Sequence, residues 1–458
     1  MPIATINPAT GETVKTFTPA TDDEVEAAIA RAYARFQDYR HNTTFAQRAA
    51  WANATADLLE KEADATAAMM TLEMGKTLAS AKGEALKCAK GFRYYAENAQ
   101  QLLADEPAEA SKVGAKKAYI RYQPLGVVLA VMPWNFPLWQ AVRFAAPALM
   151  AGNVGILKHA SNVPQSALYL SDVIARGGFP EGCFQTLLVG SGAVEGILRD
   201  PRVVAATLTG SEPAGQSVAA ICGDEIKPTV MELGGSDPFI VMPSANLDEA
   251  VKTAVIGRVQ NNGQSCIAAK RFIVHEDIYD VFVDKFVDRI QALKVGDPTD
   301  PDTDVGPLAT ESGRDEIAQQ VDDAVAAGAK VRCGGTRLDR PGWFYPPTVI
   351  TDITKDMALY TEEVFGPVAS MYRAANIDEA IEIANATTFG LGSNAWTQDE
   401  AEQARFIDDI EAGQVFINGM TVSYNELGFG GVKRSGYGRE LAGLGIRAFC
   451  NAKTVWVG

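Results

Sequence analysis

VGILKHAS, residues 154–161, is a short apolar run that ends in polar residues and is followed by a helical pattern. The same succession returns in FQTLLVG (184–190) and VAATLTGS (204–211), and DPFIVM (237–242) adds a further apolar run. A second series begins with KRFIVHE at residue 270 and continues through AKVRCGG and GPVASMYR. Apolar strands that alternate with helices predict an α/β fold with mainly parallel sheets, in two units that meet near residue 230.

The bulk composition restricts the class of protein. A chain of 458 residues is too long for one hydrophobic core, so two or three domains are expected. Hydrophobic residues make up 47% and charged residues 21%, which is typical of a globular protein, and the net charge of -16 argues against nucleic acid as a partner. The most apolar region, residues 126–157, contains three prolines and Arg143, which is poor composition for a membrane span.

The N-terminus, the cysteines and the histidines bear on location and metal chemistry. MPIATINPATGE has neither a basic nor an apolar signal region, so a secretory signal is not expected. Six cysteines lie far apart without C-x-x-C spacing, which indicates free thiols in a cytoplasmic protein. With three histidines a structural zinc site is not expected, and we predict no metal.

The two ends of the chain have patterns of their own. Thr21 and Glu24 stand at capping-box spacing before a helical stretch, and helical patterns continue to residue 104 with breaks near residues 41–44 and Lys76. NAKTVWVG, residues 451–458, reads as a strand with no sheet nearby. It is expected to pair with a distant element or with another subunit.

Three glycine-rich stretches invite a phosphate-binding interpretation. LEMGKT lacks the first glycine of a P-loop, and LLVGSGAVEG has Glu195 where the third glycine of a dinucleotide fingerprint belongs. TLTGSEPAG is the better candidate, because a strand ends at Gly210 and Ser211 where a helix begins, and helix N–H groups bind pyrophosphate. An ordinary turn with Ser211 as the N-cap is an equally good interpretation.

Three residues carry the candidate chemistry. Cys266, in NNGQSCIAAK, is either a buried packing residue or a thiolate nucleophile. Glu232, in MELGGSDP, is either a salt-bridged carboxylate at a strand end or a general base whose pKa is raised by burial. Asn135, in MPWNFP, is either a turn residue or a donor to a developing oxyanion.

Taken together, these stretches resemble the aldehyde dehydrogenase superfamily. The resemblance covers nearly the whole chain in ten ordered motifs: INPATGE, EMGKT, PWNFP, ILKHAS, LTGS, MELGGSDP, NNGQSC, EEVFGPV, FGLGSNAWT and FGGVKRSGYGRE. It implies that a Cys266 thiolate attacks an aldehyde to give a thiohemiacetal, which passes a hydride to a nicotinamide cofactor and becomes a thioester. Glu232 then activates the water that releases the acid, while Asn135 and the Cys266 N–H form the oxyanion hole. Gly263 and Ser265 would let the aldehyde and the nicotinamide ring approach the sulfur from different sides.

The resemblance also implies a set of cofactor contacts, which are Met132, Trp134, Asn135, Lys158, His159, Ala160, Ser161, Gly210, Ser211, Leu233, Glu363 and Phe365. Ser161 stands where relatives restricted to NAD tend to have a glutamate, and a neutral side chain leaves room for a 2′-phosphate. Lys158, which otherwise reads as a snorkelling surface residue, would pair with that phosphate. We therefore predict that NADP is preferred and that NAD is possible.

Arg143 lies in an otherwise apolar helical stretch and indicates the kind of substrate. It either snorkels to the surface or faces the cleft, where it meets an anion. The arrangement resembles succinate-semialdehyde dehydrogenases and implies a small aldehyde that carries a carboxylate, with glutarate semialdehyde as the alternative. Gln260 replaces an arginine found in some of these relatives, and Arg258, Ser423 or Tyr424 are candidates to supplement Arg143. Arg143→Ala is expected to raise KM for succinate semialdehyde strongly and to affect a short neutral aldehyde little.

By the resemblance, the architecture has two Rossmann-type α/β domains and a small β oligomerisation arm. The expected cofactor-binding domain uses residues 1–111, 126–231 and 421–440, the catalytic domain residues 232–420, and the arm residues 112–125 and 441–458. The C-terminal strand would then extend a sheet across the interface of a homodimer or homotetramer. Two other functions stay open: a non-catalytic protein on this scaffold, and a CoA-dependent acylating enzyme, against which the hydrolytic base Glu232 argues.

Overall fold

The computed structural model describes residues 2–458 and begins with a small antiparallel pair of strands, β1 (Ala4–Ile6) and β2 (Thr13–Thr16). Four helices follow: α1 (Asp22–Asn42), α2 (Phe45–Lys61), α3 (Ala63–Met74) and α4 (Leu78–Leu102). Capping boxes start α1 at Thr21 and α2 at Thr44, which satisfies N–H groups that a helix leaves free. The predicted breaks near residues 41–44 and Lys76 are confirmed.

The first large sheet has six strands in the order β17-β9-β8-β5-β6-β7, and all neighbours except β17 and β9 are parallel. Its strands are β5 (Val127–Met132), β6 (Val154–His159), β7 (Phe184–Thr186), β8 (Val203–Thr209), β9 (Thr229–Glu232) and β17 (Gly436–Tyr437). Helices α5 (Trp139–Ala151), α6 (Pro164–Arg176), α7 (Ala193–Arg199) and α8 (Glu212–Asp224) connect the parallel strands. The chain leaves β5 towards β6 and later places β8 on the other side. Ligands of open α/β sheets bind at the carboxyl ends of strands beside such a switch point.

The second large sheet has seven strands in the order β12-β13-β14-β11-β10-β15-β16. They are β10 (Asp237–Val241), β11 (Ala269–His275), β12 (Lys330–Cys333), β13 (Thr348–Thr351), β14 (Val368–Ala374), β15 (Asn394–Trp396) and β16 (Phe416–Ile417). Its helices are α9 (Leu247–Val259), α10 (Glu276–Gln291), α11 (Glu311–Ala326), α12 (Ile377–Asn385) and α13 (Glu400–Asp409). DPFIVM, grouped with the first series in the sequence, forms β10 and pairs with β11 and β15 of this sheet. The change of sheet therefore falls between β9 and β10.

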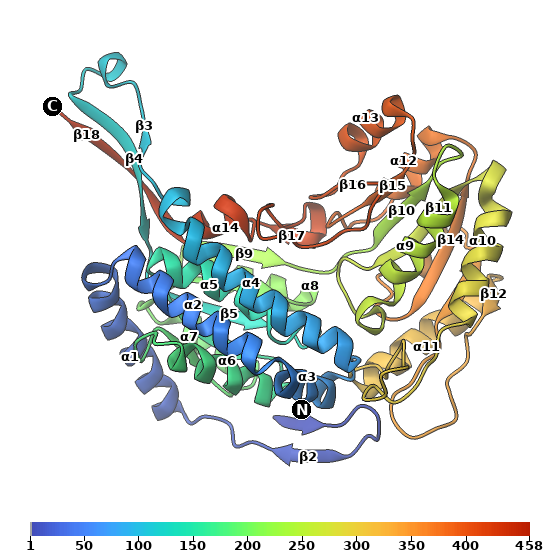
Figure 1. Ribbon diagram of the computed structural model, residues 1–458, viewed down its shortest axis with the longest axis horizontal. Helices are drawn as coiled ribbons and strands as arrows, with labels where there is room; N and C mark the ends of the chain where they lie inside the picture. Colours follow the sequence, from blue (N-terminus) through green and yellow to red (C-terminus); the bar gives the residue numbers. More distant parts are fainter. Residues whose placement is uncertain (1) are drawn as a thin grey trace.

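The third sheet is an arm that projects from the body of the molecule (Figure 1). Its strands are β3 (Glu106–Pro107), β4 (Lys117–Pro124) and β18 (Cys450–Val457), all antiparallel, with β4 in the middle. The C-terminal strand therefore pairs with a distant element of its own chain. The preceding helix, α14 (Ala442–Arg447), contacts α5 in the body. Four short 3-10 segments complete the chain: η1 (Ala110–Val113), η2 (Gln260–Gly263), η3 (Ala358–Tyr360) and η4 (Lys433–Ser435).

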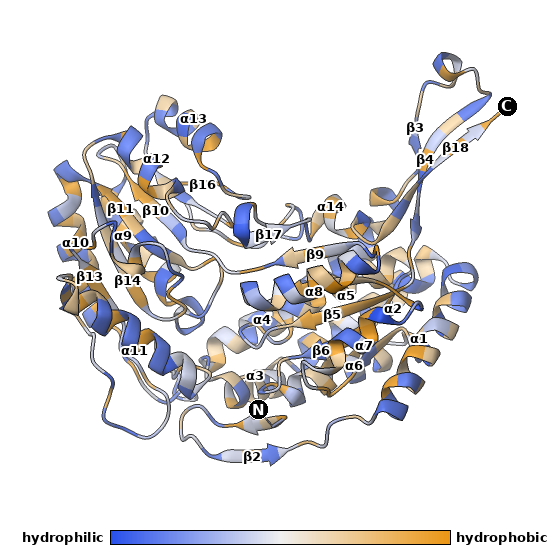
Figure 2. Ribbon diagram, turned by 180° about the vertical axis from the view of Figure 1, so that it is seen from behind, coloured by the Kyte–Doolittle hydropathy of each residue, from blue (hydrophilic) through white to orange (hydrophobic). Residues whose placement is uncertain are grey.

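Hydrophobic residues concentrate in the strands of the two large sheets and in the helix α5, whereas the outer helices α1 and α10 carry many hydrophilic residues (Figure 2). Every residue of α5 is buried. A charged side chain on this helix must therefore find its partner inside the protein. No helix within residues 2–458 combines the length and the apolar character needed to cross a membrane.

Candidate active site

A sharply bent loop presents Cys266. The loop leaves α9 through η2 and enters β11. Three consecutive residues, Asn261, Asn262 and Gly263, have positive φ values of 54°, 57° and 77°. Asparagine and glycine adopt this left-handed conformation more readily than other residues, so the NNG sequence permits a turn that most sequences resist.

The side-chain amides of the two asparagines hold this loop in place. Asn261 Nδ2 donates to the backbone oxygens of Asn135 at 2.8 Å and Gln264 at 2.9 Å. Asn262 Nδ2 donates to two other backbone oxygens at 2.9 Å, one of them that of Gly75 in the EMGKT motif. Neither asparagine is among the residues predicted from the sequence, although asparagines before a glycine are a turn signal.

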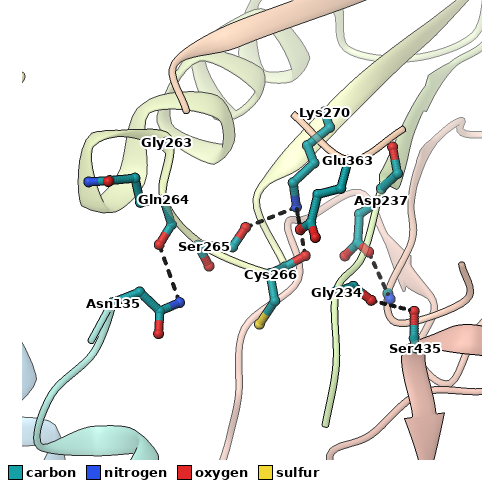
Figure 3. Close-up of polar contacts among 12 residues, drawn as sticks. Asn135, Gly234, Asp237, Gly263, Gln264, Ser265, Cys266, Lys270, Glu363 and Ser435 are labelled. Carbon is teal, nitrogen blue, oxygen red and sulfur yellow. Dashed lines mark hydrogen bonds and ion pairs between the residues drawn. The ribbon is translucent and has the colours of Figure 1, made fainter. Parts of the chain in front are cut away.

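Lys270 supports the loop on the side away from Asn135 (Figure 3). Its Nζ donates to the backbone oxygens of Ser265 at 2.9 Å and Cys266 at 2.8 Å, and it lies 3.2 Å from a carboxylate oxygen of Glu363. The side chain is buried, so the ammonium group has exchanged water for these oxygens. Sequence reasoning missed Lys270; the available signal was a lysine at the start of an apolar strand.

Two residues near the loop have roles that differ from the sequence predictions. Arg258, a candidate for substrate binding, is buried and donates to the backbone oxygens of Gly263 at 2.7 Å and Val368 at 3.2 Å. It therefore holds the loop that carries Cys266 instead of meeting a substrate. Gly263 is expected from the sequence to make room for ligands, but a Cβ there would lie 2.4 Å from the carbonyl carbon of Gly366. Glycine is required here because two backbone segments pack against each other.

The Cys266 thiol lies in the wall between two cavities. The residue is 9% exposed, and it lines one cavity of about 310 Å³ and another of about 200 Å³. Burial raises the pKa of this thiol to about 12, although the positive charges of Arg143 and Lys270 lower it in part. Formation of a thiolate at neutral pH therefore needs additional positive potential or a base.

The larger cavity, which we call the cofactor-side cavity, lies at the carboxyl ends of β5 and β8, beside the switch point of the six-stranded sheet. Seven of the predicted cofactor residues line it: Trp134, Asn135, Gly210, Ser211, Leu233, Glu363 and Phe365. The rings of Trp134 and Phe365 meet edge to face with centroids 5.8 Å apart. Ser211 is the N-cap of α8, but its side chain makes no capping hydrogen bond. Pro213 has no N–H, so the backbone N–H groups of Glu212 and Ala214 are those that the start of α8 offers to a phosphate.

The other predicted cofactor residues are at the ends of β5 and β6 and do not line this cavity; they are Met132, Lys158, His159, Ala160 and Ser161. Burial alone lowers the pKa of Lys158, with no contribution from a neighbouring charge, so this cation is suited to an anionic ligand. His159 Nδ1 accepts from the Ala160 N–H at 2.8 Å, and Nε2 lies 2.7 Å from the Pro137 oxygen. Both ring nitrogens are committed to the backbone, so a contact of His159 with the cofactor would be made by its backbone atoms.

The smaller cavity, which we call the substrate-side cavity, is lined by residues of α4, α5 and the segment that returns after β16, among them Lys87, Gln140, Arg143, Ser423 and Phe429. Ser423 thus lies where the sequence analysis placed it. Tyr424 does not line the cavity: it is 47% exposed and its ring stacks on Phe416 with centroids 6.4 Å apart. Thr421, Val422 and Ser423 line the cavity and its wall ends there, so the exposed Tyr424 is not placed to bind the substrate.

Arg143 reaches the substrate-side cavity but is already paired. It is 3% exposed, so it does not snorkel to the surface, and its guanidinium forms an ion pair with the buried carboxylate of Glu440. Arg143 Nη2 donates to Thr209 Oγ1 at 3.4 Å, and the guanidinium carbon lies 4.3 Å from the centre of the Phe429 ring. Much of its charge is therefore balanced by the protein before any ligand binds.

Glu232 ends β9 inside the protein. Burial and the nearby carboxylate of Glu440 raise its pKa well above the usual range, while Arg143 and Arg439 lower it in part. The direction agrees with the expectation for a general base in a dry place. Its own side chain lines neither cavity, but the next two residues, including Leu233, line the cofactor-side cavity.

Asn135 lies in the loop that follows β5, and its amide lies beside the loop that carries Cys266 (Figure 3). Its Nδ2 donates to the Gln264 oxygen at 3.3 Å, and its Oδ1 accepts from the Phe136 N–H at 3.0 Å. An amide nitrogen has two N–H groups, so one is available for a ligand oxygen. The site thus combines a thiol, an amide donor and a separate cavity on each side of the sulfur. This arrangement can support addition of the sulfur to the carbonyl group of one ligand and transfer of a group from that adduct to a second ligand.

Comparison with known proteins agrees with this geometry. The sequence profile of the aldehyde dehydrogenase family matches residues 1–455. The chain is 89% identical over 458 residues to a succinate-semialdehyde dehydrogenase (NADP(+)) of Mycobacterium avium, covering 100% of this chain and 97% of the relative. It is 85% identical over 457 residues to succinate-semialdehyde dehydrogenase (NADP(+)) 1 of Mycobacterium tuberculosis, covering 100% of each. The crystal structure of succinic semialdehyde dehydrogenase from Streptococcus pyogenes in complex with NADP+ matches with a TM-score of 0.97 and 37% identity over 99% of each chain. The chain belongs to the aldehyde dehydrogenase family.

Proposed function

We propose that this protein oxidises succinate semialdehyde to succinate, with NADP as the preferred hydride acceptor and NAD as a possible one. The observation that carries the proposal is the position of Cys266, which lines both the cofactor-side and the substrate-side cavity. A carbonyl group on one side and a nicotinamide on the other would meet at one sulfur. The names of the Mycobacterium avium relative and of the Streptococcus pyogenes structure support the same substrate and cofactor.

The residues at the end of the six-stranded sheet fit a dinucleotide phosphate. The uncapped N-terminus of α8 offers N–H groups to a pyrophosphate, and Lys158 offers an unpaired positive charge to a 2′-phosphate. Ser161 adds no negative charge that would oppose it. When bound, NADP would supply a hydride acceptor. The six-stranded sheet would thus belong to the cofactor-binding domain and the seven-stranded sheet to the catalytic domain.

In the first half-reaction, the Cys266 thiol would lose its proton to solvent, and the thiolate sulfur would form a bond to the aldehyde carbon while the carbonyl π electrons move to the oxygen, which gains negative charge. The free N–H of Asn135 Nδ2 and the backbone N–H of Cys266 would donate to this oxygen. Loss of a hydride from the same carbon restores the carbonyl and leaves a thioester on the sulfur. The Asn261 and Lys270 contacts keep the loop in place throughout.

In the second half-reaction, Glu232 would accept a proton from a water molecule whose oxygen attacks the thioester carbon. The carbon–sulfur bond then breaks, so that succinate leaves and Cys266 is regenerated. The raised pKa of Glu232 suits proton acceptance near neutral pH. Because its side chain lines neither cavity, it would turn towards Cys266 at this step.

The arm and the cysteines support two further parts of the proposal. We propose a homodimer or homotetramer assembled through the arm, because β18 is an edge strand with an apolar Trp456 that is 56% exposed. Edge strands with exposed apolar side chains pair readily with another chain. We also propose a cytoplasmic location, because the six cysteines are free thiols, as is usual in a reducing compartment.

A panel of aldehydes assayed with NADP and with NAD tests the proposed function. The panel contains succinate semialdehyde, glutarate semialdehyde and the neutral butanal. We expect the highest kcat/KM for succinate semialdehyde with NADP. Higher efficiency with glutarate semialdehyde would show that the substrate is the aldehyde that is one methylene longer. Higher efficiency with butanal would reject a carboxylated substrate. Higher efficiency with NAD would reject the cofactor preference.

A further inference from the structure

Lys270 contacts the peptide group that joins Ser265 to Cys266. Its Nζ donates to the Ser265 oxygen at 2.9 Å, and this oxygen belongs to the same peptide group as the Cys266 N–H. No peptide bond within residues 2–458 is cis. In a planar trans peptide the C=O and N–H groups point in opposite directions, so the Cys266 N–H points away from Lys270.

Asn135 lies on the other side of the loop from Lys270 (Figure 3). The Gln264 oxygen accepts there from Asn135 Nδ2 at 3.3 Å and from Asn261 Nδ2 at 2.9 Å. Two successive carbonyl groups are thus held from opposite sides of the loop. Within the part of the chain that the structure describes, residues 2–458, no protein oxygen accepts from the Cys266 N–H. This N–H is therefore left for a ligand oxygen on the side where Asn135 also has a free N–H.

The charge of Lys270 acts on this peptide group with little screening by water. Its side chain is 2% exposed, and Nζ also donates to the Cys266 oxygen at 2.8 Å and lies 3.2 Å from a carboxylate oxygen of Glu363. A charged donor on a carbonyl oxygen polarises the peptide group, so that its N–H becomes a stronger donor. The other residues that hold the loop contact different groups: Arg258 donates to the Gly263 oxygen, and Asn262 to the Gly75 oxygen.

We propose that Lys270 is a positioning residue of the oxyanion hole, which directs the Cys266 N–H towards the developing oxyanion and strengthens it as a donor. This inference rests on the proposed function, because it requires a carbonyl group that reacts at Cys266. The same ammonium group has a second effect, since its charge and that of Arg143 lower the pKa of the Cys266 thiol in part. A test must therefore separate the oxyanion hole from ionisation of the thiol.

Acylation of Cys266 by p-nitrophenyl acetate and alkylation by iodoacetamide separate these effects. In acylation the thiolate bonds to the ester carbon, the carbonyl oxygen carries a negative charge, and p-nitrophenolate then leaves. In alkylation the sulfur displaces iodide from a methylene carbon and no oxyanion forms. The ratio of the two rates is independent of the thiolate fraction and reports the oxyanion hole. Neither reaction needs the cofactor, so an effect of Lys270 through Glu363 does not contribute.

The experiment measures both rates in Lys270→Met, which removes the charge, and in Lys270→Arg, which keeps it. Lys252→Met is the matched control, because this exposed lysine of α9 also lies beside a glutamate, Glu249. Rates found with Cys266→Ala are subtracted, so that the other cysteines do not contribute. Lys270→Gln serves if Lys270→Met does not fold, as judged by fluorescence titration with NADP.

Lys270→Met is expected to lower the ratio of acylation to alkylation about 10- to 100-fold, less than the loss of a whole oxyanion donor, because the N–H remains but is weaker and less well directed. Lys270→Arg should restore part of the ratio, and Lys252→Met should match the wild type. A ratio in Lys270→Met within about threefold of the wild type would overturn the inference. Equal losses in both reactions would then assign Lys270 to ionisation or exposure of the thiol.

The infrared carbonyl stretch of the acetylated enzyme tests the donors directly. It is recorded in the Glu232→Gln background, which retains the thioester, as the difference between esters with and without carbon-13 in the carbonyl group. Weaker donors polarise the carbonyl less, so Lys270→Met should move the stretch to a higher frequency, and kcat/KM for succinate semialdehyde should fall together with the ratio. An unchanged frequency would assign the slower acylation to displacement of the sulfur and overturn the inference. If wild-type Cys266 is not acylated, or the wild type does not oxidise succinate semialdehyde, the proposed function fails. If the wild type does both and Lys270→Met keeps the ratio, the role of Lys270 alone fails.

Discussion

Replacing Arg143 by methionine should lower the unfolding free energy of the whole protein, and not only weaken the binding of one substrate. Methionine has a similar length but no charge. The guanidinium pairs with the buried Glu440 and lies near Glu232, so its loss leaves two buried carboxyl groups in one cluster. The contacts with Thr209 and the Phe429 ring are lost at the same time.

The size of the effect follows from the burial of the pair. Removal of one partner from a buried ion pair costs about 3–5 kcal/mol of unfolding free energy, because the other charge stays desolvated. Burial already raises the pKa of Glu440 and of Glu232 in the folded protein. A carboxyl group whose pKa is raised on folding destabilises the folded state as the pH rises above its unfolded value of about 4.3. The deficit of Arg143→Met should therefore be smaller at pH 5.5 than at pH 8.

Urea unfolding followed by tryptophan fluorescence at these two pH values measures the deficit. Arg434→Met removes an arginine from an exposed pair with Glu212 and should change the unfolding free energy by less than about 1 kcal/mol. The double variant Arg143→Met with Glu440→Leu should recover part of the loss, because both charges are then gone. A single variant within about 0.5 kcal/mol of the wild type at pH 8 would refute this reasoning. In kinetics, Arg143→Ala should impair butanal as well as succinate semialdehyde, unlike the selective effect expected from the sequence.

Three further predictions concern the chemistry. Glu232→Gln should still form NADPH in the first turnover, but its steady-state rate should fall about 10²- to 10⁴-fold because the thioester is not hydrolysed. Rapid-mixing experiments measure both rates. A steady-state rate near that of the wild type would contradict the role of Glu232 as the base. Ser161→Glu should lower kcat/KM with NADP at least about tenfold relative to kcat/KM with NAD, because a carboxylate repels the 2′-phosphate. Ser161→Gln, which adds no charge, should not have this effect. Equal effects of the two variants would reject the explanation by charge. Iodoacetamide should inactivate the free enzyme at Cys266 about tenfold faster for each pH unit between pH 7 and 9. Burial raises the pKa of the thiol to about 12, so the reactive thiolate fraction still increases over this whole range. A rate that reaches a plateau below pH 8 would contradict this prediction.

The sequence predicts the elements of the fold because strands and helices follow local patterns. The breaks at residues 41–44 and Lys76 and the strand at the C-terminus needed no knowledge of distant contacts. The assignment of DPFIVM to a sheet could not be made in this way, because pairing with β11 and β15 depends on where the chain returns.

The candidate site shows the same division. Cys266 and Asn135 stand in short motifs and Ser423 was a candidate outside them, and the structure places all three around one pair of cavities. The pairing of Arg143 with Glu440 joins residues almost 300 positions apart, so no local pattern contains it. The outward direction of Tyr424 depends on where the segment after β16 leaves the wall of the cavity, and that is set by tertiary packing which the local sequence does not contain.

The two cavities that meet at Cys266 have no other lining residue in common. Cofactor choice and aldehyde choice can therefore change largely independently in evolution or by engineering, except at contacts between the two walls such as the hydrogen bond from Arg143 to Thr209. The loop that carries Cys266 is a second exception. Any change to Asn261, Asn262 or Lys270 would move the sulfur relative to both ligands at once, so tolerance to mutation should be lowest at the residues that hold this loop in place.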